Sequence, residues 1–282
     1  MPSVPPFSRS EKVEDYAKQC APITWAERDI KSADGTAIKL LESRVNVSRE
    51  KQDQSHKIVL YLQGNASSLP PRLPYLSSIL RSLMANDSDE QQYTIIALSY
   101  RGYWKSKGRP SQQGIELDVE AALNWLLKQY DTRTKVIVWG QSIGAGAASV
   151  GLANLVKHCP GSANRISGLL LETPFVDLRT MLVALYPQKF LPYRYLAPFL
   201  LSTWDSKSAI KDIGGVRSGL RTLILEAGDD EIVPSGQGAI LETLCKNEGM
   251  EVERATVPGA LHTETMAKPR GRQHIVEFLK SF

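Results

Sequence analysis

The stretch KVIVWGQSIGAGAA, residues 135–148, joins a run of β-branched and apolar residues to a run of small ones. The first half predicts a short buried strand, and the second half predicts a helix that packs close to it. Between them, Gly140 and Gly144 flank Ser142 in the pattern G-x-S-x-G. Bulky side chains would collide with the backbone at a sharp strand-to-helix turn, so this context predicts a nucleophile elbow that presents Ser142. The alternative is a structural glycine-rich turn.

Strand and helix patterns alternate on both sides of the elbow. Two strands, at 24–30 and 37–45, are predicted around the turn dipeptide Asp34-Gly35. Further strands are predicted at 57–62, 94–100, 165–172, 221–227 and 251–257, and helices at 73–84, 115–130, 235–247 and 269–282. This alternation predicts an α/β fold, with a mostly parallel sheet covered by helices on both faces.

The clearest helix pattern covers residues 115–130. Apolar residues fall at three-and-four spacing there, which places one apolar stripe along the helix. Glu116, Asp118 and Glu120 are expected to lie away from that stripe, near the N-terminal end, where acidic side chains suit the helix dipole.

The sequence predicts one α/β domain at 24–282, preceded by a polar leader at 1–23. The interval between the strands that end at 172 and begin at 221 is too long for an ordinary connection. Its content of Leu, Tyr, Phe, Trp and Pro predicts a short helical cap, at about 175–212, over the strand ends where ligands bind in open α/β sheets. The alternative is an excursion that packs its aromatic side chains against the domain.

Composition and charge favour a globular protein without a nucleic-acid partner. Hydrophobic residues make up 42% of the chain and charged residues 23%, which are ordinary globular values. The net charge is +4, and the cations are scattered among acidic residues rather than gathered in a stripe. One local concentration, Arg101, Lys105, Lys107 and Arg109, is either a solvated loop or a surface that attracts an anionic substrate head group or membrane surface.

The cysteines and the N-terminal residues favour a cytoplasmic protein. Cys20, Cys159 and Cys245 share no metal-type or redox-type spacing, which indicates reduced thiols. Residues 1–16 lack the apolar run of a signal peptide. The apolar window at 181–204 is interrupted by charges and prolines and is not expected to span a bilayer. No motif for a metal or an organic cofactor occurs, and the sequence does not predict an oligomeric state.

A serine hydroxyl is nearly inert at neutral pH, so a nucleophilic serine needs a histidine base and a carboxylate that orients the base. Of the four histidines, His56 precedes a strand, His158 lies in a polar loop and His274 lies within the last predicted helix. His262 lies in the loop between the final strand and the final helix, at the carboxyl edge of the sheet. We therefore expect His262 to be the base.

The acid should follow a strand and precede the histidine in the chain. Asp229, Asp230 and Glu231 form a compact cluster just after the strand at 221–227. Asp230 is the preferred orienting carboxylate, and Asp229 and Glu231 are expected to be solvated.

Two alternatives to Asp230 are left open. One is Asp229 beside it. The other is the end of the preceding strand, where Glu172 and Asp177 lie, because some hydrolases take their acid from that position. With Asp230 the chain order is nucleophile, acid, base.

Negative charge that develops on a carbonyl oxygen needs N–H donors that are already in place. One donor is the backbone amide of Ile143, at the start of the helix after the serine, where unpaired N–H groups favour an anion. The other is the backbone amide of Asn65, in the segment Gln63-Gly64-Asn65-Ala66 after the strand at 57–62. The alternative for this segment is a plain strand-to-helix turn.

Together these motifs resemble those of the eukaryotic α/β-hydrolase-domain serine hydrolases. The most similar groups are lysophosphatidylserine and monoacylglycerol lipases, with protein depalmitoylases nearby. The resemblance runs from about residue 24 to the C-terminus and implies the α/β-hydrolase fold with a Ser142, Asp230 and His262 triad. It rests on five ordered segments: Leu62–Ala66, Tyr100–Tyr103, Gly140–Gly144, Asp230–Pro234 and Pro258–His262.

The chain departs from this family at the first of those segments. The family usually has His-Gly-Asn where this chain has Gln63-Gly64-Asn65. Because the donor is a backbone amide, the oxyanion hole is expected to be retained, with different supporting hydrogen bonds. Several relatives also carry an N-terminal membrane span, which this sequence does not predict.

We expect a serine hydrolase that cleaves a carboxylic ester or thioester of a small-molecule acyl substrate, without a cofactor, through an acyl-enzyme on Ser142. The aromatic interval favours an apolar acyl group, as in an acylglycerol, a lysophospholipid or an acyl thioester. Two other functions remain open. One is lactone opening or acyl transfer in biosynthesis, and the other is ligand binding by a catalytically weak homologue, which Gln63 motivates.

Overall fold

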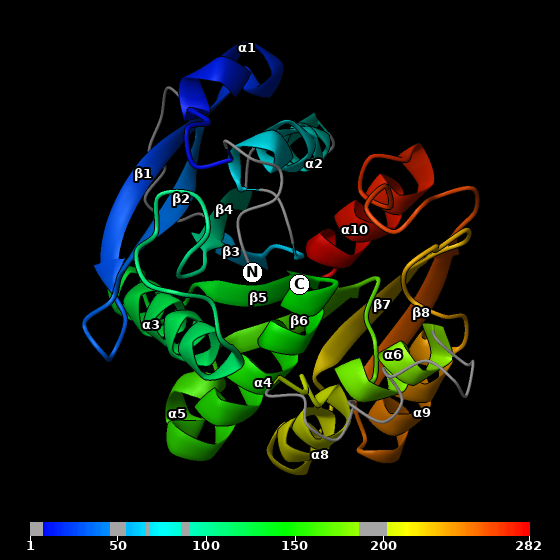
Figure 1. Ribbon diagram of the computed structural model, residues 1–282. Coiled ribbons are helices and arrows are strands. Elements are labelled where there is room, and N and C mark those ends of the chain that lie inside the picture. Colours follow the sequence, from blue (N-terminus) through cyan, green and yellow to red (C-terminus); the bar gives the residue numbers. More distant parts are fainter. Residues whose placement is uncertain (1–7, 46–54, 66–67, 86–90, 186–201) are drawn as a thin grey trace.

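An eight-stranded sheet crosses the molecule in the computed structural model (Figure 1). The structure describes residues 8–45, 55–65, 68–85, 91–185 and 202–282. Within them the strand order is β1-β2-β4-β3-β5-β6-β7-β8. The strands are β1 (Ile23–Lys31), β2 (Ala37–Val45), β3 (Ser55–Leu62), β4 (Gln91–Ser99), β5 (Lys135–Gln141), β6 (Ile166–Glu172), β7 (Arg221–Ala227) and β8 (Glu251–Val257).

Strands β3 to β8 are parallel, and β1 and β2 add an antiparallel edge. β1 pairs with β2, and β2 pairs with β4, in antiparallel register, whereas the other neighbouring pairs are parallel. The predicted entry hairpin and the mostly parallel sheet are therefore confirmed. Because the parallel strands point the same way, the segments after β3, β5, β7 and β8 all emerge at one edge of the sheet.

Helices cover both faces of the sheet, as the sequence predicts (Figure 1). They are α1 (Ala17–Cys20), α2 (Leu73–Ala85), α3 (Gln112–Gln129), α4 (Ile143–His158), α5 (Pro160–Ala163), α6 (Leu178–Leu185), α8 (Ser206–Val216), α9 (Gln237–Asn247) and α10 (Pro269–Lys280), with 3-10 turns η1 (Val13–Tyr16) and η2 (Pro70–Arg72). No helix in the described ranges is both long enough and apolar enough to cross a membrane.

The two helical layers pack against alternate side chains of the strands. α2 and α10 cover one face, and α3, α4, α8 and α9 cover the other. Leu60 of β3 packs into the core on the α3 and α4 side, and its neighbours Val59 and Tyr61 pack beneath α2 and α10. The sheet is thus buried on both faces, which leaves its edge of strand ends as the place for a site.

α3 begins earlier than predicted and buries one of its acidic residues. Its first turn is capped by Ser111, whose hydroxyl oxygen accepts a hydrogen bond from the Gly114 N–H at 3.1 Å. The expectation that Asp118 lies away from the core is wrong, because this side chain is 0% exposed. It accepts hydrogen bonds from the main-chain N–H and the guanidinium of Arg101, each at 2.8 Å. A buried carboxylate needs such a partner.

The interval between β6 and β7 contains α6 and α8 among its described residues. The middle of the predicted cap, 186–201, lies outside the described residues. α8 buries Ala209, Ile210 and Ile213 and packs against α4 and α9. This part of the interval therefore belongs to the helical layer on the α4 side of the sheet.

Residues 8–20, within the predicted polar leader, lie against the α2 side of the molecule. η1 and α1 form there, and Cys20 is buried in the core beneath α2. The carbonyl oxygen of Cys20 accepts a hydrogen bond from Arg81 of α2 at 3.1 Å. The carbonyl oxygen of Glu11 accepts one from the indole N–H of Trp104 at 2.8 Å. This segment therefore packs on the α/β core.

Candidate active site

Ser142 lies at the turn between β5 and α4, in a backbone conformation that few residues adopt. Its φ is 55° and its ψ is −120°, a region that strongly favours glycine. A Cβ atom on Gly140 would lie 2.1 Å from the carbonyl oxygen of Gly144, so nothing larger than glycine fits there. The chain therefore forms the strained strand-to-helix turn that can present a nucleophile.

The imidazole of His262 lies beside the Ser142 hydroxyl. Its Nε2 is 2.8 Å from Oγ, which is hydrogen-bond distance. His262 follows β8 in the loop before α10 and is 5% exposed. Its main-chain N–H donates to the Glu231 carboxylate at 2.9 Å, so the loops after β7 and β8 are tied together. An imidazole in this place can accept the hydroxyl proton.

Asp230 lies behind the imidazole. Its Oδ2 and Oδ1 are 2.9 and 3.0 Å from His262 Nδ1. Oδ1 also accepts hydrogen bonds from the N–H groups of Ile232 and Val233, at 2.9 and 2.7 Å. Burial alone would raise the pKa of Asp230, but the hydrogen bonds from His262 and from these N–H groups outweigh it and hold the pKa below its usual value. The carboxylate is therefore charged and can orient His262.

The other acidic candidates lie elsewhere. Asp229 is exposed, as expected. Glu231 is also exposed, but its carboxylate accepts a hydrogen bond from the main-chain N–H of His262 in addition to facing solvent. Glu172 is buried behind the elbow, and Asp177 accepts the Thr180 N–H in the first turn of α6. Among the described residues, Asp230 is the carboxylate that bonds the His262 ring.

The predicted oxyanion segment lies next to Ser142. A Cβ atom on Gly64 would lie 3.4 Å from the Cβ of Ser142, so the glycine lets this backbone approach the serine. Asn65 is exposed, and its Oδ1 accepts a hydrogen bond from the Tyr103 hydroxyl at 2.8 Å. Ile143 is the first residue of α4, where N–H groups have no intrahelical partner. The structure thus brings the segments of both predicted donors to the serine.

Gln63 is buried, and its side-chain amide has no hydrogen-bond partner in the described part of the chain. The residue is 1% exposed, and neither Oε1 nor Nε2 has a hydrogen-bond partner among the described residues. Its carbonyl oxygen accepts a hydrogen bond from the Tyr100 hydroxyl at 3.0 Å. Support for the segment therefore comes from Tyr100 and Tyr103. The sequence predicts no role for these tyrosines, although the segment Tyr100–Tyr103, which carries part of the family resemblance, is the signal that could have identified them.

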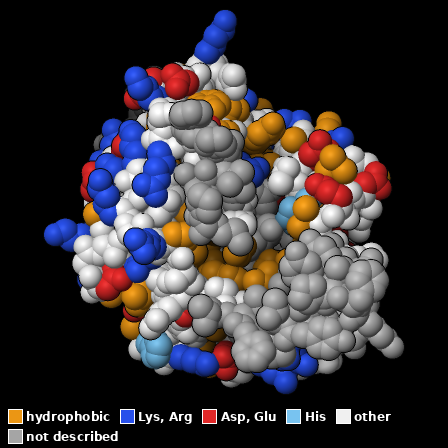
Figure 2. Space-filling view, viewed as in Figure 1, with side chains coloured by type: hydrophobic (Ala, Val, Ile, Leu, Met, Phe, Trp, Pro, Cys, Tyr) orange, Lys and Arg blue, Asp and Glu red, His pale blue; other side chains and the backbone are white. Residues whose placement is uncertain are grey.

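Apolar side chains border the site. Leu261, next to His262, is 44% exposed, and Ile232, close to Asp230, is 42% exposed. Figure 2 shows hydrophobic side chains at the bottom of a hollow, with a histidine at its edge. A small cavity of about 70 Å³ adjoins Asp230 and is lined in part by Thr173 and Pro174. An apolar group is therefore compatible with these surroundings.

Ion pairs neutralise two of the four cations in the basic loop. Arg101 bonds Asp118 at 2.8 Å and Asp34 at 2.6 Å, and Lys105 pairs with Glu27. The other two cations of the loop are exposed. Figure 2 shows Lys and Arg side chains gathered toward the left of the view, on the side of β1 and β2. The loop is therefore anchored by its charges as well as solvated.

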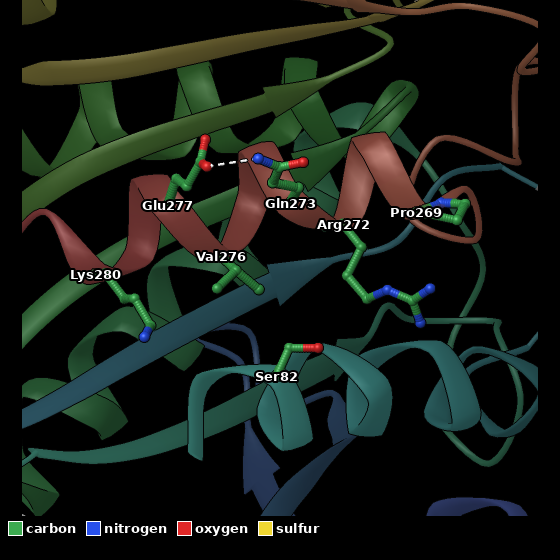
Figure 3. A pocket seen from close by; sticks show the side chains of 7 residues that line it. All are labelled: Ser82, Pro269, Arg272, Gln273, Val276, Glu277 and Lys280. Atoms are coloured by element: carbon green, nitrogen blue, oxygen red, sulfur yellow. Dashed lines mark hydrogen bonds between the residues drawn. The ribbon is translucent and has the colours of Figure 1, made fainter. Parts of the chain in front are cut away.

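A separate groove of about 440 Å³ lies between α2 and α10 (Figure 3). Arg272, Gln273 and Lys280 of α10 line it together with Ser82 of α2. None of the three predicted triad residues lines this groove, so it is not the place where they would react. No cluster of three or more His, Cys, Asp or Glu side chains that could hold a metal ion occurs there or elsewhere in the described residues.

Comparison with known proteins identifies the family. Residues 57–194 match the family described as alpha/beta hydrolase fold. Protein bem46 of Schizosaccharomyces pombe is 30% identical over 232 residues, which cover 82% of this chain and 70% of that protein. The chain belongs to the α/β-hydrolase family. The lysophosphatidylserine lipase ABHD12 of Danio rerio is 32% identical over 202 residues, which confirms the resemblance to this group of α/β hydrolases.

The shared length differs among the relatives. The match to ABHD12 covers 69% of this chain but 49% of the lipase. The match to the α/β-hydrolase domain-containing protein WAV2 of Arabidopsis thaliana, at 29% identity, covers 73% of this chain and 64% of that protein. The chain thus spans about half to two thirds of the length of these two α/β hydrolases.

Solved structures show the same fold. An α/β hydrolase from Vibrio vulnificus has a TM-score of 0.71 at 18% identity, over 98% of this chain and 88% of that one. An esterase of Pyrococcus furiosus has a TM-score of 0.68 at 19% identity, over 96% of this chain and 93% of that one. The α/β-hydrolase fold expected from the sequence is confirmed.

Proposed function

We propose that this α/β hydrolase is a serine hydrolase that cleaves a carboxylic ester or thioester through an acyl-enzyme on Ser142. The observation that carries the proposal is the 2.8 Å contact between Ser142 Oγ and His262 Nε2, with Asp230 bonded to Nδ1 of the same ring. A hydroxyl, a base in reach and a charged carboxylate behind the base are the groups that nucleophilic catalysis by serine requires.

The reaction follows from these positions. His262 Nε2 takes the hydroxyl proton as Ser142 Oγ attacks the carbonyl carbon. The backbone amides of Ile143 and Asn65 stabilise the negative charge on the former carbonyl oxygen. His262 then gives its proton to the leaving alcohol or thiol, and the acyl group remains on Oγ. Water attacks the acyl-enzyme and gives a proton to His262, which returns it to Oγ as the carboxylic acid leaves. Asp230 stabilises the imidazolium in both steps.

An ester with an apolar acyl chain is the substrate class we propose. The exposed Leu261 and Ile232 beside the base and the acid favour contact with an apolar group. The relative from Danio rerio that bears the name lysophosphatidylserine lipase supports an acyl ester. In a series of p-nitrophenyl esters, kcat/KM is expected to rise from acetate to medium-chain acyl groups. Highest activity on acetate would contradict this substrate class.

Ser142→Ala tests the proposed reaction. This variant is expected to lose hydrolysis of a p-nitrophenyl acyl ester and labelling by a fluorophosphonate, and His262→Ala is expected to lose nearly as much because the residues act as a unit. Ser149→Ala is the matched control, since Ser149 is another α4 serine whose hydroxyl donates to the Ala145 carbonyl oxygen inside the helix. Labelling that survives Ser142→Ala would overturn the proposal.

A catalytically weak ligand-binding protein is the second candidate, because the Gln63 amide beside the nucleophile has no partner among the described residues. Such a protein would show no acyl-enzyme burst with any activated ester, whereas a hydrolase shows one. The burst amplitude per protein molecule therefore separates the two functions.

We also propose a cytoplasmic location. Support comes from Cys20, Cys159 and Cys245, which are all free thiols. Fractionation of cells that express the tagged chain tests this location, and recovery in a secreted fraction would contradict it.

A further inference from the structure

Glu172 holds the elbow from behind. It is the last residue of β6 and is 0% exposed. Its carboxylate accepts hydrogen bonds from the indole N–H of Trp139 at 3.0 Å and from the side-chain amide of Gln141 at 3.2 Å. Its carbonyl oxygen accepts the N–H of Ser142 at 2.8 Å. The carboxylate of Glu172 therefore holds two side chains of β5, and its main-chain carbonyl holds the backbone at Ser142.

The same carboxylate also holds the loop that carries the base. Thr265, which follows His262 by three residues and is 0% exposed, donates its hydroxyl hydrogen to Glu172 Oε1. One buried side chain thus bridges β5 and the loop after β8.

The bridge extends to the strand that precedes the oxyanion segment. Gln141 Oε1 accepts a hydrogen bond from the Tyr61 hydroxyl of β3 at 3.1 Å. Gln141 therefore uses its amide nitrogen on Glu172 and its amide oxygen on Tyr61. A continuous set of buried hydrogen bonds joins β3, the elbow and the histidine loop.

A carboxylate in this place is costly for the fold. Burial raises the pKa of Glu172, and the hydrogen bonds from Thr265 and Trp139 and the charge of Arg72 only partly offset this effect. Thr173, the next residue, has a φ of 45°, which is unfavourable for a β-branched side chain. An apolar residue would fill this buried position at a lower cost in folding free energy. We therefore expect Glu172 to have a role other than filling space in the core. Strained and costly groups tend to gather at functional sites.

We propose that Glu172 is a positioning residue, which holds Thr265 against the elbow through a hydrogen bond and thereby keeps His262 Nε2 within hydrogen-bond reach of Ser142 Oγ. The inference rests on the proposed function, since it assigns Glu172 to the same reaction. Glu172 acts on the position of His262 through Thr265 and does not contact the reacting atoms. A displacement of the base by about 1 Å can cost a hundredfold in rate, so a clamp of this kind affects kcat.

Two variants on the two sides of the bridge test the proposal. Glu172→Gln weakens the acceptor, and Thr265→Val removes the hydroxyl while it keeps the shape of the side chain. Each is expected to lower kcat for a p-nitrophenyl ester by about tenfold to a hundredfold with KM unchanged. Thr265→Ser restores a hydroxyl and is expected to recover most of the rate.

A matched control separates positioning from stability. Ser77 is a fully buried hydroxyl on α2 that accepts a hydrogen bond from the Trp25 indole at 2.9 Å. Ser77→Ala is expected to lower the melting temperature while kcat of the folded protein stays the same. If Thr265→Val behaves like this control, Glu172 has a merely structural role and the proposal is wrong. Thr265→Val also decides the matter if Glu172→Gln does not fold.

A readout without substrate distinguishes failure of this inference from failure of the proposed function. The Nδ1 proton that His262 shares with Asp230 is expected to give a far-downfield proton resonance in the NMR spectrum. Glu172→Gln and Thr265→Val are expected to shift or broaden it, and Ser77→Ala to leave it in place. If the wild type hydrolyses no ester, the proposed function is wrong. If the variants still change the resonance in that case, Glu172 nevertheless positions His262. An unchanged resonance would overturn the positioning role whatever the activity.

Discussion

A Cβ atom on Gly144 would lie 2.1 Å from the carbonyl oxygen of Leu62. The backbones of helix α4 and strand β3 therefore come into close approach at this point, one residue before Gln63 and two residues after Ser142. This contact sets how closely the predicted oxyanion segment, residues 63–66, approaches Ser142. The small residues after the elbow serve the geometry of the site as well as the packing of the helix.

Gly144→Ala is expected to destabilise the protein by about 1–3 kcal/mol or more, because backbone atoms must move to admit the methyl group. Gly161 in α5 is the control, since a Cβ atom there meets nothing within 4 Å. Gly161→Ala is expected to be neutral or to stabilise by up to about 1 kcal/mol. Urea denaturation of both variants measures the difference, and equal midpoints would show that α4 and β3 can separate freely.

Asp230→Asn is expected to lower kcat by about 10⁴-fold while the folded structure persists. The amide has the same shape, but it no longer favours the Nδ1–H form of His262 or stabilises the imidazolium. Asp229→Asn, at the exposed neighbour, is expected to retain nearly full activity. Steady-state kinetics on one activated ester compares the two, and a larger loss at Asp229 would move the acid to that position.

Gln63→Met is expected to increase the free energy of unfolding by about 1 kcal/mol, because an unpaired buried amide costs about 1–3 kcal/mol. Gln141→Met is the matched control at an equally buried glutamine, whose amide bonds Tyr61 and Glu172. It is expected to destabilise by a similar amount, because it leaves those partners unsatisfied. Chemical denaturation would contradict this difference if both variants lost stability equally.

Asp230 and Glu172 are expected to change stability with pH in opposite directions. The pKa of Asp230 lies below its ordinary 3.8 in the folded protein, so its contribution is present above that pH and is lost as pH falls through the folded pKa. The pKa of Glu172 lies above its ordinary 4.5, so its contribution is present below that pH and is lost as pH rises through the folded pKa.

Variants at these two carboxylates isolate the two contributions. The free energy of unfolding, measured between about pH 3 and pH 7, is expected to fall less steeply at the acidic end in Asp230→Asn and less steeply toward neutral pH in Glu172→Gln. Slopes identical to those of the wild type would show that neither group titrates differently on folding.

The parts of the fold that could be predicted depend on neighbouring residues. The strand before Ser142 and the small residues after it lie within one short stretch, and the alternation of buried runs with amphipathic helices predicts the sheet and both helical layers. The sequence predicted the region of α8 only as the end of a helical cap, because Gly214 and Gly215 weaken the helix pattern near Val216 and the burial of α8 comes from packing against α4 and α9.

The features that escaped prediction depend on partners distant in the chain. Asp118 can be buried because Arg101 donates hydrogen bonds to its carboxylate, and the spacing of residues within one helix cannot predict such a partner. Glu172 appeared from sequence only as an alternative acid, because its bonds to Trp139 and Thr265 exist only when β5, β6 and the loop after β8 are neighbours. The roles of Ser142, Asp230 and His262 remain predictions that the kinetics above would test.

The backbone at residue 142 has an evolutionary consequence. Its φ of 55° and ψ of −120° cost a serine about 1–3 kcal/mol and cost glycine far less. Exchange of Ser142 for glycine is thus expected to stabilise the fold while it removes the proposed nucleophile. Under the proposed function, selection for catalysis keeps the serine at this position, and a lineage without that selection is expected to retain the fold and lose the serine first.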